Sequence, residues 1–192
     1  ELMLPEHIEY GWCYDAEGFK TFDEIHNETL ERLDKNPNLK VILAHVFFMD
    51  EDLKEANRVM EKYPHLCLDL APHTGMFESF SKDVEGWREF FLKYQDRIMF
   101  GSDADDRRDQ KTIDEIYNIV YTSMSSDGNE KIIPCYDMDW KIKGLSLPEE
   151  VLNKIFHDNF LRFMDGKRNE VNNELLLNMA EMAYEKLKTI PG

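Results

Sequence analysis

The sequence predicts an α/β fold built on a parallel sheet. Three short apolar runs, at residues 40–45, 65–71 and 97–103, alternate with stretches in which apolar residues recur every three or four positions. The runs begin about 25 to 32 residues apart, which is the spacing that parallel strand–helix–strand crossovers need. The last fifty residues have a helical pattern throughout. We therefore expect parallel strands connected by helices, followed by a helical C-terminal part.

The first helix is predicted to begin near Thr21. Thr21 and Glu24 have the spacing of a capping box, in which each residue hydrogen-bonds the backbone of the other. The sequence AsnProAsn at 36–38 ends the helix. Its apolar residues lie at roughly helical spacing and are Phe22, Ile25, Leu30 and Leu33.

The middle of the chain repeats this strand–helix unit. Residues 40–45 form a continuous aliphatic run that ends in a histidine, as expected of a strand buried on both faces of a parallel sheet. A helix is expected over residues 50–63, where Pro64 stops it. Further helices are expected around residues 84–94 and 113–124, after the second and third strands.

The last third is predicted to leave the strand–helix pattern. Residues 125–144 contain a loose Ser-, Asp- and Gly-containing stretch and are expected to be irregular. Ser146 and Glu149 have the spacing of a second capping box, with Pro148 in the first turn of the helix that follows. A final helix is expected over residues 169–187.

The composition excludes several classes of protein. Lys and Arg total 23 and Asp and Glu total 39, so the formal net charge is −16, which argues against binding to nucleic acid or to a membrane surface. The longest apolar run, residues 41–49, is far shorter than the roughly 18 residues of a membrane-spanning helix. The three cysteines, Cys13, Cys67 and Cys135, have no metal-site spacing, and the start of the sequence has no signal-peptide pattern. A cytoplasmic location is therefore expected.

Three side chains are candidates for chemistry. His45 ends the first predicted strand and Asp103 ends the third, so both are expected at the carboxyl edge of the sheet, where ligands bind in parallel α/β folds. Two structural roles remain open, because His45 could be a core histidine and Asp103 could cap the next helix. His73 follows the second strand and is either a substrate contact or a solvated loop residue.

Four segments, taken in order, resemble the amidohydrolase-related metal-dependent hydrolases. They are AsnLeuLysValIleLeuAlaHis (38–45), TyrProHisLeuCysLeuAspLeu (63–70), AspArgIleMetPheGlySerAsp (96–103), and residues 151–164 with Asn159. The resemblance implies a TIM-barrel-like (β/α)8 metallo-hydrolase fold, of which this chain holds only the C-terminal part, with three to four strands. Residues 1–165 would form the partial barrel, with strands matching the sixth to eighth, and residues 166–192 a helical extension.

The resemblance also implies roles for the candidate residues. Asp103 matches the aspartate of the eighth strand, which binds the active-site divalent metal and orients or deprotonates its water. His45 matches the histidine of the sixth strand, a metal ligand in some branches of the family and an acid, base or substrate contact in others. An imidazole and a carboxylate suit Zn²⁺ or Mn²⁺, and the metal lowers the pKa of bound water toward neutrality.

The sequence departs from the family in two respects. The family's first strand carries a His-x-His pair, and none of the six histidines here forms one: His7, His26, His45, His65, His73 and His157. A complete barrel needs about 250 residues, and the chain has 192. We therefore expect a second copy or a missing N-terminal half to cover the exposed sheet edges and apolar helix faces, and little metal binding by the isolated chain.

The expected function is a metal-dependent hydrolase of a small carbonyl or carboxylate substrate. A non-oxidative decarboxylase of the same superfamily is an alternative, because loop shape decides between the two reactions. A truncated, non-catalytic homologue that serves as a binding or oligomerisation module is another, because the His-x-His pair is missing.

Overall fold

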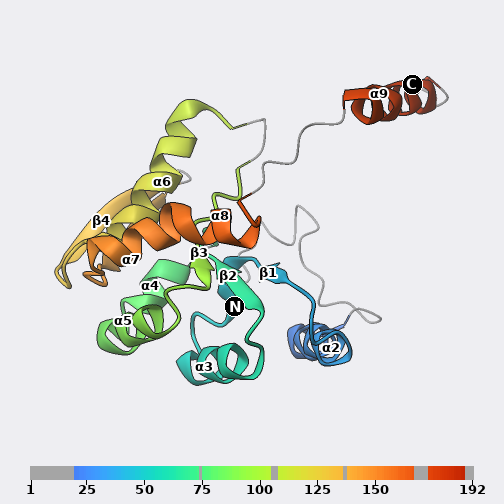
Figure 1. The fold of residues 1–192 in the computed structure, drawn as a ribbon. Helices are drawn as coiled ribbons and strands as arrows, with labels where there is room; N and C mark the ends of the chain where they lie inside the picture. Colours follow the sequence, from blue (N-terminus) through green and yellow to red (C-terminus); the bar gives the residue numbers. More distant parts are fainter. Residues whose placement is uncertain (1–19, 74, 105–107, 136–137, 167–172, 189–192) are drawn as a thin grey trace.

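A three-stranded parallel sheet lies at the centre of the protein (Figure 1). The computed structural model describes residues 20–73, 75–104, 108–135, 138–166 and 173–188. The strands are β1 (Val41–Leu43), β2 (Leu66–Asp69) and β3 (Ile98–Met99), and they are hydrogen-bonded in that order. Val41 pairs with Leu66, and Leu68 pairs with Ile98. All three predicted strands are confirmed, and they form an open sheet as expected of a partial barrel.

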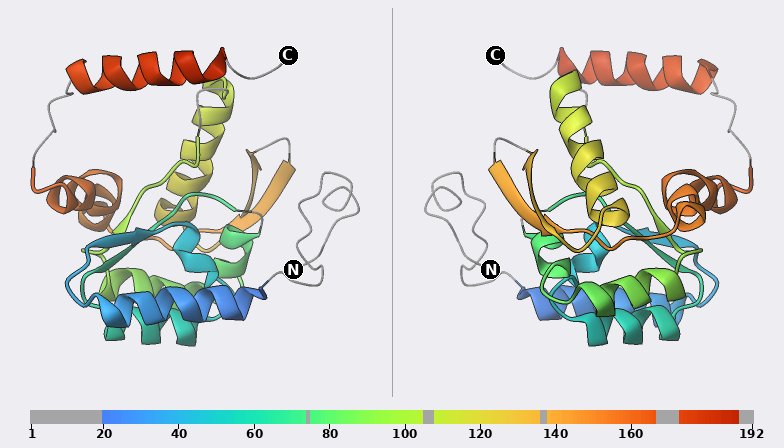
Figure 2. Two further views of the ribbon diagram at one scale, coloured as in Figure 1. Left: turned by 90° about the vertical axis from the view of Figure 1, so that its right-hand side faces the viewer. Right: turned by 90° about the vertical axis from the view of Figure 1, so that its left-hand side faces the viewer.

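Three helices lie along one side of the sheet (Figures 1 and 2): α2 (Phe22–Lys35), α3 (Leu53–Lys62) and α5 (Val84–Lys93). The predicted capping box of α2 is confirmed, because Thr21 Oγ1 accepts the Glu24 N–H at 3.2 Å and Glu24 Oε2 accepts the Thr21 N–H at 2.7 Å. Tyr63 joins the end of α3 to α2 by donating its hydroxyl proton to Asp34 at 2.9 Å.

A short helix and a hairpin lie outside the expected pattern. Helix α4 (Met76–Phe80) follows β2, and α6 (Gln110–Ser125) follows β3. The expectation of an irregular segment at 125–144 was wrong, because β4 (Glu130–Cys135) and β5 (Met138–Lys143) form an antiparallel pair. The hairpin is stabilised by Trp140 and Ile142, which alternate along β5 and bury their side chains in the core.

The closing helix is continuous but contains a wider turn. It consists of α7 (Glu149–Asn153), the π-helical turn η2 (Lys154–Asp158) and α8 (Asn159–Phe163). The capping box predicted at Ser146 was wrong. Pro148 is the residue before the helix, no side chain caps it, and the Ser146 hydroxyl instead donates to the Ser126 carbonyl at 3.2 Å.

Aromatic side chains dominate the core below the sheet. Phe80 packs against Trp87 with ring centroids 4.6 Å apart and against Phe91 at 5.6 Å, in tilted and edge-on arrangements. Leu66, Leu68 and Ile98 contribute the strand side of the same core and are almost completely buried. The strands and the helices α4 and α5 therefore share one hydrophobic core.

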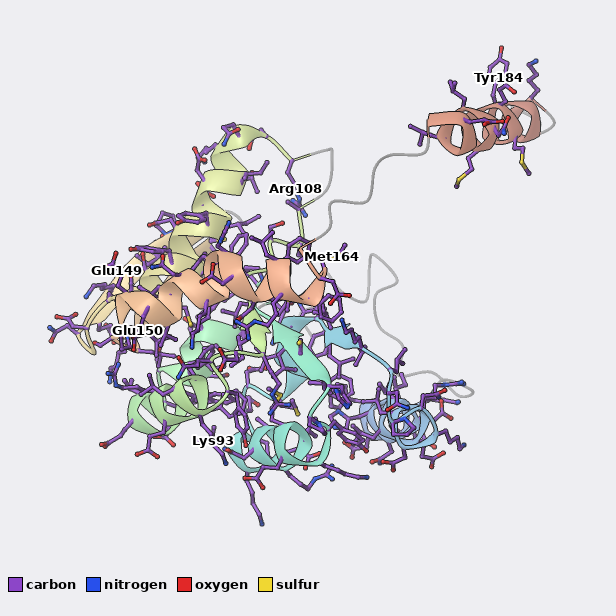
Figure 3. The ribbon with its side chains drawn as sticks, viewed as in Figure 1. Lys93, Arg108, Glu149, Glu150, Met164 and Tyr184 are labelled. Carbon is purple, nitrogen blue, oxygen red and sulfur yellow. The ribbon has the colours of Figure 1, made fainter. Side chains whose placement is uncertain are left out.

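The last helix, α9 (Asn173–Leu187), lies apart from the sheet and its helices (Figure 1). Figure 3 shows Tyr184 pointing away from the body of the protein, and its side chain is 61% exposed. Leu176, Leu177 and Met179 are also more than half exposed. Within the described residues, no helix combines the length and apolar content that crossing a membrane requires.

Candidate active site

The three candidate residues follow the three parallel strands. His45 comes after β1, His73 after β2 and Asp103 after β3. Because the strands are parallel, their carboxyl ends lie at the same edge of the sheet. Neighbouring strands are about 4.8 Å apart, so the ends of β1 and β3 are separated by roughly 10 Å of backbone, with β2 between them. The topology thus agrees with the predicted edge for all three residues.

His45 begins a left-handed turn. Residues His45, Val46, Phe47 and Phe48 all have φ between 51° and 56°, a region that L-residues other than glycine seldom adopt. The turn is closed by the Phe47 N–H, which donates to the Ala44 carbonyl at 2.8 Å, and by the Met49 N–H, which donates to Val46 at 3.2 Å. Backbone held in an unfavourable conformation is found preferentially at functional sites. The turn therefore supports a role for His45 beyond packing.

The hydrogen bond of His45 to Ala71 determines which ring nitrogen carries the proton. Its Nδ1 lies 2.9 Å from the carbonyl oxygen of Ala71. A carbonyl only accepts, so Nδ1 carries the proton and, in the neutral ring, Nε2 carries the lone pair. Histidines that bind metals commonly donate their second N–H in this way. His45 is thus arranged to offer Nε2 to a metal or a substrate.

His73 is held by a buried carboxylate. Its Nε2 lies 2.9 Å from Oδ1 of Asp50, whose residue is only 5% exposed. Burial alone would raise the pKa of Asp50, but the hydrogen bond and charge of His73 outweigh it and hold this pKa below its usual value. The His73 side chain is 20% exposed. It is therefore an ordered residue rather than a solvated loop histidine.

His45 and His73 lie next to each other. Their ring centroids are 6.0 Å apart and the rings are nearly perpendicular, at 86°. Phe48 packs against both, with centroids 5.2 Å from His45 and 5.0 Å from His73, and is itself 46% exposed. The structure therefore brings together two of the three predicted site residues beside an apolar wall.

Asp103 lies at the same edge and is exposed. It has a φ of 50°, like the residues of the turn at His45. It does not cap the following helix, because Asp109 does so by accepting the Thr112 N–H at 2.8 Å. The capping role that the sequence left open for Asp103 is therefore wrong. Within the described residues, no hydrogen bond joins Asp103 to His45 or His73.

The donor atoms fit a divalent cation in kind but are few in number. An imidazole nitrogen and a carboxylate suit Zn²⁺ or Mn²⁺. Among the residues that the structure describes, however, no three His, Cys, Asp or Glu side chains gather closely enough to hold an ion. His45 and Asp103 would thus supply part of a coordination shell. A hollow of about 400 Å³ is lined by Asp50, Ser79 and Trp87, among others, but by neither of these two residues.

Comparison with known protein families shows which family the chain belongs to. Residues 20–164 match the family model described as Amidohydrolase, a range that runs from before α2 to the end of α8. The chain belongs to the amidohydrolase family. No curated protein and no solved structure is significantly similar to it. The open parallel sheet, with no closed barrel in the described part of the chain, agrees with a partial TIM-barrel fold of this family.

Sequence reasoning missed two carboxylates at this candidate site. Asp50, which holds His73, follows the apolar run that ends at Met49. Asp69 is the last residue of β2, and its Oδ1 accepts the backbone N–H of His45 at 3.0 Å. In both cases an acidic residue directly after, or at the end of, a buried apolar segment was the available signal.

Proposed function

We propose that this chain carries part of the active site of a metal-dependent hydrolase that acts on a small carbonyl or carboxylate substrate. The observation that carries the proposal is the placement of His45 and Asp103 after parallel strands of one sheet, with His45 donating from Nδ1 and keeping Nε2 as an acceptor. Membership of the amidohydrolase family supports the same class of reaction.

In this proposal the residues have different roles. His45 and Asp103 would hold the divalent ion, Zn²⁺ or Mn²⁺, which when bound polarises a carbonyl and lowers the pKa of a water. His73, kept in one orientation by Asp50, would contact the polar group of the substrate. Phe48 would exclude water from one side of the site, because its ring covers both histidines.

The proposed site needs donors that the described residues do not supply. Structural and catalytic Zn²⁺ sites use three or four protein ligands. We therefore propose that a second copy of the chain, or sequence that precedes residue 1, completes the coordination. The 1–165 segment would then be the barrel part and the 166–192 segment a helical extension, and the chain on its own would bind metal weakly.

Two other functions are alternatives, and measurement of metal binding tests the second of them. A non-oxidative decarboxylase would use the same edge and differ in releasing CO₂ from a carboxylate substrate. A non-catalytic module is favoured by one observation, namely that no three metal-binding side chains gather within the described residues. The first alternative leaves the metal requirement unchanged, whereas the second removes it.

Titration with Zn²⁺ tests the proposal. We expect His45→Gln and Asp103→Asn each to weaken Zn²⁺ binding at least about tenfold, because each removes one donor. His157→Gln is the matched control, because His157 lies on η2 with a side chain that is 70% exposed. Zn²⁺ binding that is equal in all four proteins would contradict a metal site at His45 and Asp103.

A further inference from the structure

We propose that Asp69 is the positioning residue of this site, and that it determines which nitrogen His45 presents to a ligand. Asp69 would not touch metal or substrate. Its carboxylate would act through the backbone at the ends of β1 and β2. The geometric part of this proposal stands alone, whereas its consequence for metal binding rests on the proposed function.

A closed set of three hydrogen bonds connects Asp69, His45 and Ala71. Asp69 Oδ1 accepts the backbone N–H of His45 at 3.0 Å and the backbone N–H of Ala71 at 3.0 Å. The carbonyl of Ala71 in turn accepts Nδ1–H of His45 at 2.9 Å. One carboxylate oxygen therefore fixes both the backbone that carries the imidazole and the residue that receives its proton.

The left-handed turn explains why a side-chain acceptor is needed at this point. His45 leaves the strand conformation at φ 56°, so β1 ends before it and its N–H has no partner in the sheet ladder. A half-buried N–H without an acceptor is unfavourable. Asp69 supplies that acceptor at His45, the first residue of the turn. The turn then directs the His45 ring toward the carbonyl of Ala71.

The third strand closes the space around the same carboxylate. A Cβ added to Gly101 would lie 2.9 Å from Cγ of Asp69 and 3.0 Å from the backbone nitrogen of Ala71. Only glycine leaves room for this approach. Asp69 is therefore enclosed by the ends of all three strands and cannot change rotamer without breaking the contacts described above.

The tautomer of His45 is the spectroscopic test. In the metal-free chain, at a pH where the ring is neutral, we expect its ¹⁵N signals to report Nδ1–H in the unmodified protein and in Asp69→Asn, whose amide oxygen can accept the same two bonds. In Asp69→Ala we expect a shift toward the Nε2–H form that free histidine prefers. His45→Gln assigns the signals, and the His73 signals should not change.

A matched variant separates this role from loss of stability. Asp83→Ala also removes a carboxylate that accepts a backbone N–H, that of Gly86 at 3.0 Å, but it does so at the start of α5. We expect it to leave the His45 tautomer unchanged. If Asp69→Ala does not fold, Gly101→Ala replaces it, because the added methyl group presses on the same carboxylate, and the same direction of shift is expected.

Metal titration distinguishes the two proposals. With Zn²⁺ as the probe, we expect Asp69→Ala to weaken binding about tenfold and Asp69→Asn to restore it almost completely. An unchanged His45 tautomer in Asp69→Ala, or in Gly101→Ala where Asp69→Ala does not fold, would overturn the role of Asp69 whatever the metal data show. If His45→Gln instead leaves Zn²⁺ binding intact, the proposed function fails, and the tautomer result still decides the role of Asp69.

Discussion

Asp50 is the one acidic residue in the described part of the chain whose side chain is almost fully buried. A buried carboxylate is costly unless it is paired, and Asp50 is paired with His73 at 2.9 Å. Because the pKa of Asp50 is lowered from 3.8 in the fold, its ionised form stabilises the native state above pH 4. That contribution is lost as the pH falls through the lower folded value.

We expect Asp50→Asn to lower the free energy of unfolding by about 1.5–3 kcal/mol at pH 7, the range for hydrogen bonds to charged groups. The difference from the unmodified protein should shrink below about pH 4, where the unfolded chain takes up the proton first. Urea unfolding at several pH values measures this. Glu51→Gln is the control, because Glu51 is 74% exposed and its pair with Lys82 should contribute little. A difference in free energy of unfolding that does not change with pH would contradict a stabilising role of ionised Asp50.

The site residues divide into those that a sequence pattern can reveal and those that it cannot. His45 and Asp103 interrupt apolar runs at the ends of strands, so their position at the carboxyl edge followed from periodicity. The roles of Asp50 and Asp69 depend on a left-handed turn of four non-glycine residues. No local pattern predicts such a turn, because it is imposed by tertiary contacts rather than by the residues that form it.

At the scale of elements, the helices whose apolar residues recur every three or four positions were predicted well. The helices at α2, α3, α5 and α6 have apolar residues at helical spacing and begin near the expected residues. The hairpin β4–β5 was missed although Trp140 and Ile142 alternate along β5, because the Ser-, Asp- and Gly-containing stretch before it indicated an irregular segment. Pro134 lies next to the end of β4, opposite Asp139, where a lost donor matters least.

Asn159 provides a test of how the closing helix is attached. Its Nδ2 donates to the carbonyls of Gln95 at 2.7 Å and Ile98 at 2.6 Å, so the first residue of α8 is tied to β3 and to the loop before it. We expect Asn159→Ala to lower the free energy of unfolding by about 2–4 kcal/mol, because two carbonyls lose their donor in a buried position. Thermal unfolding measures this.

The control for Asn159→Ala is Asn153→Ala on α7. Asn153 is exposed, and replacing it with a better helix former should change the melting temperature little or raise it. Equal melting temperatures for the two variants would show that the hydrogen bonds of Asn159 do not hold the helix to β3.

At the scale of the whole molecule, no further strand lies beside β1 or β3 in the described part of the chain. Beside β1, Phe22, Ile25 and Phe48 are about half exposed. Beside β3, a hollow of about 300 Å³ is lined by Phe100, Phe156, Phe160 and Leu161, among others, and the last two are also largely exposed. Apolar surface of this extent on both sides of an open sheet favours association.

Association of the chain has to overcome its own charge. The formal net charge of −16 repels a second copy, and salt screens that repulsion within a Debye length of about 8–10 Å near physiological ionic strength. We therefore expect sedimentation velocity to show a larger associated fraction as salt is raised from about 20 to about 500 mM, because apolar contacts are not screened.

Single substitutions locate the surface that associates. Phe160→Asp should reduce association if the β3 side forms the contact, because it adds charge to an exposed apolar position that is 52% accessible. Leu177→Asp makes the same change on α9 and should have no effect in that case. A smaller effect of Phe160→Asp than of Leu177→Asp would assign the association surface to α9. A protein that stays monomeric at every salt concentration would contradict the expectation that a second copy covers the open sheet.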